Sequence, residues 1–328
     1  MLRWGILGTG FISNTVADAI KASDGSRIEA VAGRNEKALT GFQSAHKIPR
    51  QIVGYDTIVA DPDIDVIYIG LPNHVHHTLT MKASDNGKAV LSEKSLTTTM
   101  EEARVLVNKV QQNQTFFVEG LMYLAHPFCR KLHSVLTDGR LGALKSVNGF
   151  YAADIWKLVN PLGNGTLYNL GCYPVSLLQF VVQTLCGEAA FSARKMQGFG
   201  NISKHDGNIC DAAVTVRFDD GVLANLQSTD SYGKAFGFSI CGENGMLTFT
   251  SSPWMPEPGR SVFTWLPYGG EAEEVFIEDE HNAFYHQIKM VEAALTEGRT
   301  EALRPSPRLQ DSLEVMSFLT EWEHLCKS

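Results

Sequence analysis

The first eleven residues constrain the fold of this chain more than any other stretch. An apolar run that starts at Leu2 predicts a short β-strand, and Gly8-Thr9-Gly10 follows it directly. Gly8 suits a tight turn, and Gly10 has no Cβ to keep the backbone away from a phosphate group. A helix expected over 11–22 would point its N-terminal amides and positive dipole end at that anion. The order strand, glycine turn, helix therefore predicts a dinucleotide-binding domain.

This interpretation assigns the turn and the helix start to the cofactor: Gly8, Thr9, Gly10, Phe11 and Ile12. The usual third glycine is absent, because Ser13 stands in its place. Serine is small enough to keep the helix close to the strand. An ordinary turn is the alternative interpretation of so short a motif.

Length and composition narrow the possible partners. A chain of 328 residues is longer than one average domain, so two domains are expected. A net charge of −8 and the absence of a basic run argue against nucleic acids and anionic membranes. The six cysteines are scattered without a C-x-x-C pair, which favours reduced, buried thiols. With no expected signal peptide or membrane span, we expect a cytoplasmic protein.

The first part of the chain alternates strands and helices. Strands are expected over 27–33, 66–71, 88–92 and 115–118, with helices between them at 36–46 and from Thr97 onward. This alternation predicts an α/β Rossmann domain, a doubly wound parallel sheet, over residues 1–120.

The residues after the second strand bear on the choice between NAD and NADP. A carboxylate there would bind the ribose 2′-hydroxyl of NAD, whereas an arginine suits the 2′-phosphate of NADP. Arg34 stands at this position, and no acidic residue occurs before Glu36. NADP is therefore the expected cofactor and NAD the less favoured one. A solvated surface arginine is the alternative.

Polar residues follow the next two strands, where ligands bind in sheets of this type. The first group, Leu71-Pro72-Asn73 with His76, is expected to contact the cofactor, and Asn73 to cap the next helix. The histidines at 74, 76 and 77 lack metal-ligand spacing, so no metal is expected. The second group is Glu93-Lys94. Its lysine suits a catalytic role, whereas a loop ion pair is the alternative.

The second part, 121–328, changes character. Helices are expected over 128–137, 170–185, 282–297 and 306–327. Strands are expected over 146–152, 213–218, 222–228, 236–241, 246–250, 262–266 and 274–277, several joined by hairpin-like turns. This pattern predicts an α+β domain with a large, open, mainly antiparallel sheet.

Together these features resemble the Gfo/Idh/MocA oxidoreductase family over essentially the whole chain. The segments that carry the resemblance are Gly8-Thr9-Gly10, Pro72-Asn73-His74-Val75-His76, Glu93-Lys94, Glu119-Gly120-Leu121-Met122-Tyr123, Leu170-Gly171-Cys172-Tyr173-Pro174 and Asp311-Ser312-Leu313-Glu314-Val315-Met316. Within the family, the chain looks most like the branch of trans-1,2-dihydrobenzene-1,2-diol dehydrogenase and NADP-dependent D-xylose 1-dehydrogenase.

The resemblance implies a hydride transfer between a nicotinamide, held between the domains, and a carbinol or carbonyl carbon of a sugar or diol. It maps the family lysine onto Lys94, which would hold the substrate oxygen. The family acid/base maps onto Tyr173, four residues after Asn169, and this spacing places both on one helix face. It also implies a homodimer or a higher homo-oligomer through the C-terminal sheet.

Three departures from the family pattern stand out. Ser95 replaces the proline after the lysine, and Leu124 replaces an arginine that often follows the Met-Tyr pair. Asn169 replaces the family aspartate, and an amide cannot supply a negative charge near Lys94. Two other functions remain open: a nicotinamide-dependent glycosidase of the same family, against which Arg34 counts, and a non-catalytic ligand sensor, which Asn169 supports.

Overall fold

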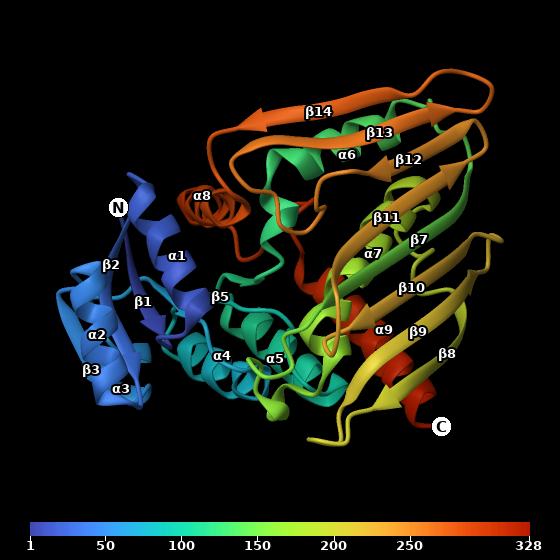
Figure 1. Cartoon of the computed structure of the whole chain (residues 1–328). Coiled ribbons are helices and arrows are strands. Elements are labelled where there is room, and N and C mark those ends of the chain that lie inside the picture. The colour runs from blue at the N-terminus through green and yellow to red at the C-terminus, as the bar shows by residue number, and fades with distance from the viewer. The chain divides into compact units, whose positions relative to one another are not determined.

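The computed structural model describes residues 1–328, which form two compact units (Figure 1). Unit 1 comprises Met1–Met122 and Ala283–Leu313, and unit 2 comprises Tyr123–Asn282 and Glu314–Ser328. None of the helices combines the length and hydrophobicity needed to cross a bilayer.

Unit 1 is built on six parallel strands in the order β3-β2-β1-β4-β5-β6. This is the strand order of a Rossmann fold: successive strands are added on one side of β1 up to β3 and then on its other side from β4 onward. The strand bounds are β1 Leu2–Leu7, β2 Ser26–Gly33, β3 Arg50–Val53, β4 Val66–Ile69, β5 Ala89–Ser92 and β6 Phe117–Glu119. All four residues of β4 and of β5 are buried, as expected of central parallel strands.

Two helices of unit 1 begin at residues whose side chains cap them. Asn35 accepts a hydrogen bond from the amide of Ala38, and Thr99 accepts one from that of Glu102. The first cap opens α2 and the second opens α5. The helix bounds are α1 Phe11–Ala22, α2 Glu36–His46, α3 Asp56–Val59, α4 His76–Asp85, α5 Met100–Asn113 and α8 Ala283–Thr296.

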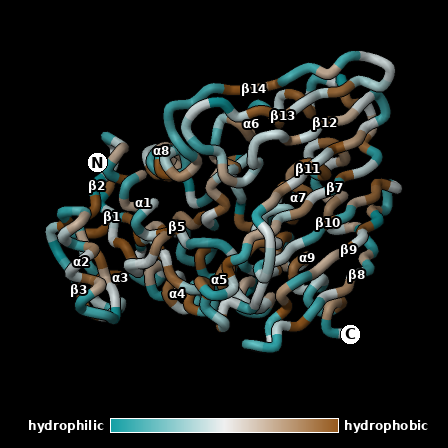
Figure 2. The backbone as a smooth tube through the Cα atoms, in the orientation of Figure 1, coloured by the Kyte–Doolittle hydropathy of each residue, from teal (hydrophilic) through white to brown (hydrophobic).

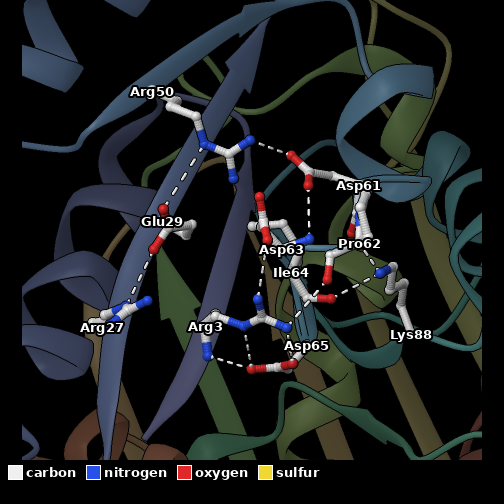
Figure 3. A network of polar contacts seen from close by, with 10 residues as sticks. All are labelled: Arg3, Arg27, Glu29, Arg50, Asp61, Pro62, Asp63, Ile64, Asp65 and Lys88. Atoms are coloured by element: carbon white, nitrogen blue, oxygen red, sulfur yellow. Dashed lines mark hydrogen bonds and ion pairs between the residues drawn. The ribbon is translucent and has the colours of Figure 1, made fainter.

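A network of charged side chains ties together strand starts and connections of this sheet (Figure 3). Arg3 donates to both carboxylate oxygens of Asp65, and Arg50 forms an ion pair with Asp61 at 2.5 Å. Lys88 donates to the backbone carbonyls of Asp61 and Ile64. These groups precede or open β1, β3, β4 and β5, so the network stabilises the edge opposite the carboxyl ends of the strands.

Unit 2 contains an eight-stranded sheet in the order β14-β13-β12-β11-β7-β10-β9-β8. All neighbours are antiparallel except β7 and β10, which run parallel. The bounds are β7 Leu144–Ala153, β8 Arg194–Ile202, β9 Ile209–Phe218, β10 Leu223–Thr229, β11 Lys234–Gly242, β12 Gly245–Phe249, β13 Gly259–Pro267 and β14 Glu273–Asp279. The predicted fold class is therefore confirmed.

Helices cover one face of this sheet, namely α6 Pro127–Thr137, α7 Cys172–Cys186 and the later part of α9 Leu309–Lys327 (Figure 1). Along β9 and β10 buried and exposed residues alternate, which is the pattern of a sheet with one covered face. Figure 2 shows the corresponding alternation of brown and teal along these strands.

Several details differ from the sequence-based expectations. The strands β3 and β8 were not expected, and β8 in particular has a weak strand pattern, because two glycines, an asparagine and a glutamine interrupt its apolar residues. All six cysteines are free, but only Cys129 and Cys172 are buried.

The expected single division at residue 120 also needs correction, because residues 283–313 group with unit 1. The reason is the packing of α8 on α1: Glu292 accepts hydrogen bonds from Ser23 and Ser26, each at 2.6 Å. A further bridge joins Phe117 of β6 to Glu301.

Candidate functional site

The glycine turn after β1 has the geometry of a phosphate cradle. Gly8 has a φ of +105°, and a Cβ added there would lie 2.6 Å from the carbonyl oxygen of Gly70. An L-residue is therefore disfavoured both by conformation and by space. Gly10 has open space around the position of its missing Cβ. This is the opening that a pyrophosphate needs above the turn.

The start of α1 is open to an anion. Gly10 is its N-cap and supplies no side-chain hydrogen bond to the first turn. The first-turn residue Phe11 is 85% exposed. Ser13, by contrast, is buried, and its hydroxyl donates to the carbonyl of Gly70 at 3.4 Å. Ser13 thus gives the close helix-to-strand contact expected of the third fingerprint position, and the amides of α1 are left for an anion.

Arg34 follows β2 directly and is exposed at the carboxyl edge of the sheet. The next residue, Asn35, is occupied as the cap of α2. A long, mobile guanidinium at this position can bind a 2′-phosphate with two parallel hydrogen bonds. The first carboxylate after it, Glu36, is already inside the helix.

The segment after β4 holds a buried histidine. One ring nitrogen of His76, Nδ1, lies 2.8 Å from the carbonyl oxygen of Ser95, and the other, Nε2, lies 2.7 Å from that of Leu71. His76 therefore links the loops that follow β4 and β5. Within the candidate cofactor site, His76 therefore positions these two loops.

The expectation that Asn73 caps the next helix is wrong. Asn73 is the first residue of a short 3₁₀ turn, Asn73–Val75, and α4 begins only after Val75 without a side-chain cap. Pro72 precedes the turn with an extended backbone. Asn73 is nevertheless buried at the carboxyl edge of the sheet, beside Leu71 and Pro72.

Two carboxyl groups are buried beside the loop that carries Lys94. Burial raises the pKa of Glu93 to about 7, against the opposing effect of the Lys94 ammonium and of a hydrogen bond from Tyr68. Burial likewise raises the pKa of Glu119 to about 7. Lys94 itself is half-buried. A half-buried amine beside two carboxyl groups with raised pKa values is typical of a catalytic cleft.

In unit 2, Asn169 lies in a π-helical turn, Leu167–Gly171, that leads into α7. π-Turns of this kind are frequent at functional sites. The Asn169 amide donates to the carboxylate of Asp230 at 3.2 Å. Burial raises the pKa of Asp230 to about 6, despite this hydrogen bond.

Asn169 and Asp230 line a cavity of about 290 Å³ at one end of the sheet. Its walls come from the residues after β7, the β8–β9 loop, the π-turn and the residues after β10. Trp156 and His205 stack in its wall with ring centroids 4.5 Å apart. An indole face beside amides and carboxylates suits a ligand with both apolar and hydroxyl-bearing surfaces.

Tyr173 does not line this cavity. It is buried at the start of α7, where its ring packs edge-on against Tyr151, with centroids 5.6 Å apart, and lies 6.2 Å from the ring of Tyr123. Asn169 and Tyr173 were expected to share one helix face. They do not lie on one regular α-helix, because the π-turn ends between them. The cavity therefore contains one of the two expected residues.

The expected cofactor residues of unit 1 do lie at the carboxyl ends of strands β1, β2, β4 and β5. Sequence reasoning did not identify Asp230 or Trp156. The available signal was weak: both follow strands, β10 and β7, whose parallel pairing brings their carboxyl ends together. Ser95 and Leu124, at the two other departures from the family pattern, are both buried.

Comparison with known proteins identifies the family of the chain. Residues 2–120 match the family model described as "Oxidoreductase family, NAD-binding Rossmann fold", and residues 129–248 match the "GFO/IDH/MocA C-terminal domain". The chain is 29% identical over 260 residues to trans-1,2-dihydrobenzene-1,2-diol dehydrogenase of Xenopus laevis, which is 77% of each chain. It is 28% identical over 285 residues to 1,5-anhydro-D-fructose reductase of Ensifer adhaerens, 82% of this chain and 79% of the other.

Solved structures show the same fold. The 3-ketoreductase KijD10 of Actinomadura kijaniata, with NADP and TDP-benzene, superimposes with a TM-score of 0.86 at 20% identity, covering 99% of this chain and 98% of the other. Levoglucosan dehydrogenase, with NADH and levoglucosan, gives a TM-score of 0.82 at 17% identity, covering 99% and 97%. With both family models matched in order and sugar or diol oxidoreductases among its relatives, the chain belongs to the Gfo/Idh/MocA family of NAD(P)-binding oxidoreductases.

Proposed function

We propose that this protein is an NADP(H)-dependent dehydrogenase or reductase that acts on CH–OH groups of a sugar, a diol or a related small molecule. The observation that carries the proposal is the arrangement at the carboxyl edge of the first sheet. An open helix start follows the Gly8 turn, and Arg34 rather than a carboxylate follows the neighbouring strand. The cradle fits a pyrophosphate, and the arginine fits a 2′-phosphate.

The residues that we propose to hold the cofactor lie in the glycine turn and in the loops after β2, β4 and β5: Gly8, Thr9, Gly10, Phe11, Ile12, Arg34, Leu71, Pro72, Asn73, His76, Glu93 and Lys94. When bound, the nicotinamide supplies or accepts a hydride at a carbinol or carbonyl carbon. NADP rests on Arg34, because relatives of the same fold are seen with NADP and with NADH.

Three residues are proposed to act on the substrate. The Lys94 ammonium would donate to the substrate oxygen as negative charge develops on it. The Tyr173 phenol would exchange the proton of that oxygen. Asn169 would orient a substrate hydroxyl from the cavity wall of unit 2, where its amide is already positioned by Asp230.

The open face of the second sheet is proposed to associate with another copy of the chain. Phe199 is 84% exposed there, and Phe150 and Leu223 are also exposed. Large apolar side chains that stand together on an uncovered sheet face are typical of an interface. Free cysteines are consistent with a cytoplasmic location.

An assay with three compounds taken from the names of the relatives tests the function. Trans-1,2-dihydrobenzene-1,2-diol and levoglucosan are offered with NADP⁺ or NAD⁺, and 1,5-anhydro-D-fructose with NADPH or NADH. Net conversion of free cofactor with at least one compound supports the proposal. Hydrolysis of a glycoside without net cofactor change would indicate a glycosidase instead, and binding without conversion a sensor.

A further inference from the structure

Asp230 occupies an unusual position for a charged side chain. It is only 3% exposed, yet it lines the cavity that contains Asn169. No lysine or arginine forms an ion pair with it, and the amide of Asn169 is its side-chain partner. The nearest other charges that act on it, Asp206 and Asp211, have the same sign. A buried carboxylate with so little compensation is costly, and such groups concentrate where a ligand supplies the missing donors.

The backbone holds this carboxylate in place. The amides of Ile155 and Trp156 both donate to the carbonyl of Asp230 at 3.0 Å, and the Asp230 amide donates to the carbonyl of Cys210 at 3.1 Å. The residues after β7 are thus fastened to the residue after β10. Backbone hydrogen bonds thus fix Asp230 at the cavity wall, and one carboxylate oxygen also accepts from the amide of Asn169.

Asn169 marks the position at which this chain departs from the family aspartate. Its amide nitrogen lies 3.2 Å from a carboxylate oxygen of Asp230. The negative charge that position 169 lacks is therefore present in the same cavity, on a residue from the end of a strand. A carboxylate at position 169 could not donate this hydrogen bond. Two carboxylates at this distance would instead raise each other's pKa, because their charges have the same sign.

We propose that Asp230 is the substrate-binding carboxylate of this protein, accepting a hydrogen bond from a substrate hydroxyl in place of a carboxylate at position 169. This proposal rests on the proposed function in taking the ligand of the cavity to be a hydroxyl-bearing substrate. Asp230 thereby binds and positions the substrate, and the amide of Asn169 holds the Asp230 carboxylate in place.

The test compares four forms of the full-length protein: the parent, Asp230→Asn, the exchanged pair Asn169→Asp with Asp230→Asn, and Asp154→Asn as a control. Asp154 is an exposed carboxylate in the segment after β7, outside the cavity. Two readouts are taken with the three compounds named above. One is the dissociation constant in the presence of NADP⁺ or NADPH, measured by calorimetry, and the other is kcat/KM.

Loss of a hydrogen bond to a charged acceptor predicts that Asp230→Asn weakens binding and lowers kcat/KM at least about tenfold. The exchanged pair restores a carboxylate and an amide to the same two positions, so it should recover to within about threefold of the parent. Asp154→Asn should match the parent. A purely structural role for Asp230 predicts something different, namely a lower melting temperature in Asp230→Asn and no recovery in the exchanged pair.

A pH series separates the two roles further. The other titratable groups around Asp230 are His205, Lys204, Asp206 and Cys210 in the cavity wall, with Asp211 beside it. Substrate affinity of the parent should fall as the pH drops through about 6, the pKa of Asp230, because the protonated acid is a weaker acceptor. Asp230→Asn should lose this dependence while the other groups remain.

The outcomes distinguish this proposal from the proposed function. If the parent converts a compound and Asp230→Asn binds and converts it equally well, the role of Asp230 is refuted and the oxidoreductase assignment stands. If the parent binds a compound without converting it, the assignment fails, and the affinity of Asp230→Asn still decides the role of Asp230. If the parent binds none of the compounds, both proposals are contradicted.

Discussion

The side-chain amide of Asn169 donates to the carboxylate of Asp230 across 3.2 Å in the wall of a cavity. The two residues reach this position from different elements: Asn169 belongs to the π-turn before α7, and Asp230 directly follows strand β10. In the sequence, Asn169 stands where the family has a charged residue. In the structure, its amide is paired with a carboxylate from another element.

Arg34→Ala tests the choice of cofactor. If the guanidinium binds the 2′-phosphate, the parent should bind NADPH at least ~tenfold more tightly than NADH, which is about 1.4 kcal/mol. The substitution should remove most of that difference and leave the affinity for NADH nearly unchanged. Fluorescence titration of both cofactors provides the measurement. Arg27→Ala, near the start of β2, is the matched control, and equal affinities in the parent would refute the assignment.

Lys94→Met tests the role of the amine in the chemical step. A donor that acts on developing charge stabilises the transition state more than the ground state. The variant should lower kcat by a hundredfold or more, about 2.7 kcal/mol, while still binding NADPH. Lys82→Met, which removes an exposed lysine paired with Asp56, is the control. Near-normal turnover in Lys94→Met would show that Lys94 takes no part in the chemical step.

Tyr173→Phe separates proton transfer from packing. Removal of a general acid–base group should lower kcat by roughly a hundredfold or more. The ring contacts with Tyr151 and Tyr123 survive in phenylalanine, so the melting temperature should change little. Tyr232→Phe removes an exposed phenol of the same unit and should leave kcat unchanged. If Tyr173→Phe keeps the rate and pH profile of the parent, the tyrosine only packs the interior of unit 2.

Asp311→Asn tests the buried ion cluster at the start of α9. Burial raises the pKa of Asp311, but hydrogen bonds from Arg308 and Arg304 outweigh it and leave the pKa below its ordinary value. The ionised carboxylate therefore contributes stability above its unfolded-state pKa, near 4, and that contribution is lost as the pH falls further. The variant should lose roughly 2 kcal/mol at pH 7.

Thermal unfolding at several pH values measures this loss. The difference between the parent and Asp311→Asn should shrink toward low pH, because protonation removes the same charge in the parent. A difference that stays constant down to pH 3 would show that the cluster acts through its shape and not through its charge.

Much of the fold could be predicted from local pattern. The glycine turn, the apolar central strands and the caps at Asn35 and Thr99 depend on neighbouring residues, and the bounds of α1 and α2 agree with the structure. The edge strands β3 and β8 could not, because polar residues and, in β8, two glycines weaken their strand pattern. The return of α8 to unit 1 depends on contacts such as Glu292 with Ser26.

The candidate site divides in the same way. The sequence motif identifies Gly8, Gly10 and Arg34 because a local turn and one strand end position them. Asp230 and Trp156 were not predicted, since their proximity follows from the parallel pairing of β7 with β10, strands about 80 residues apart. The separation of Tyr173 from the cavity follows from a π-turn, whose extra residue alters the helical spacing.

The most direct test of the central claim follows the hydride itself. NADPH carrying deuterium at both positions of C4 of the reduced nicotinamide is incubated with the protein and 1,5-anhydro-D-fructose or another carbonyl substrate that it converts, and the product is examined by mass spectrometry. The account predicts one deuterium on the new carbinol carbon and one NADP⁺ formed for each product molecule. A product without deuterium, or turnover without net formation of NADP⁺, would contradict it.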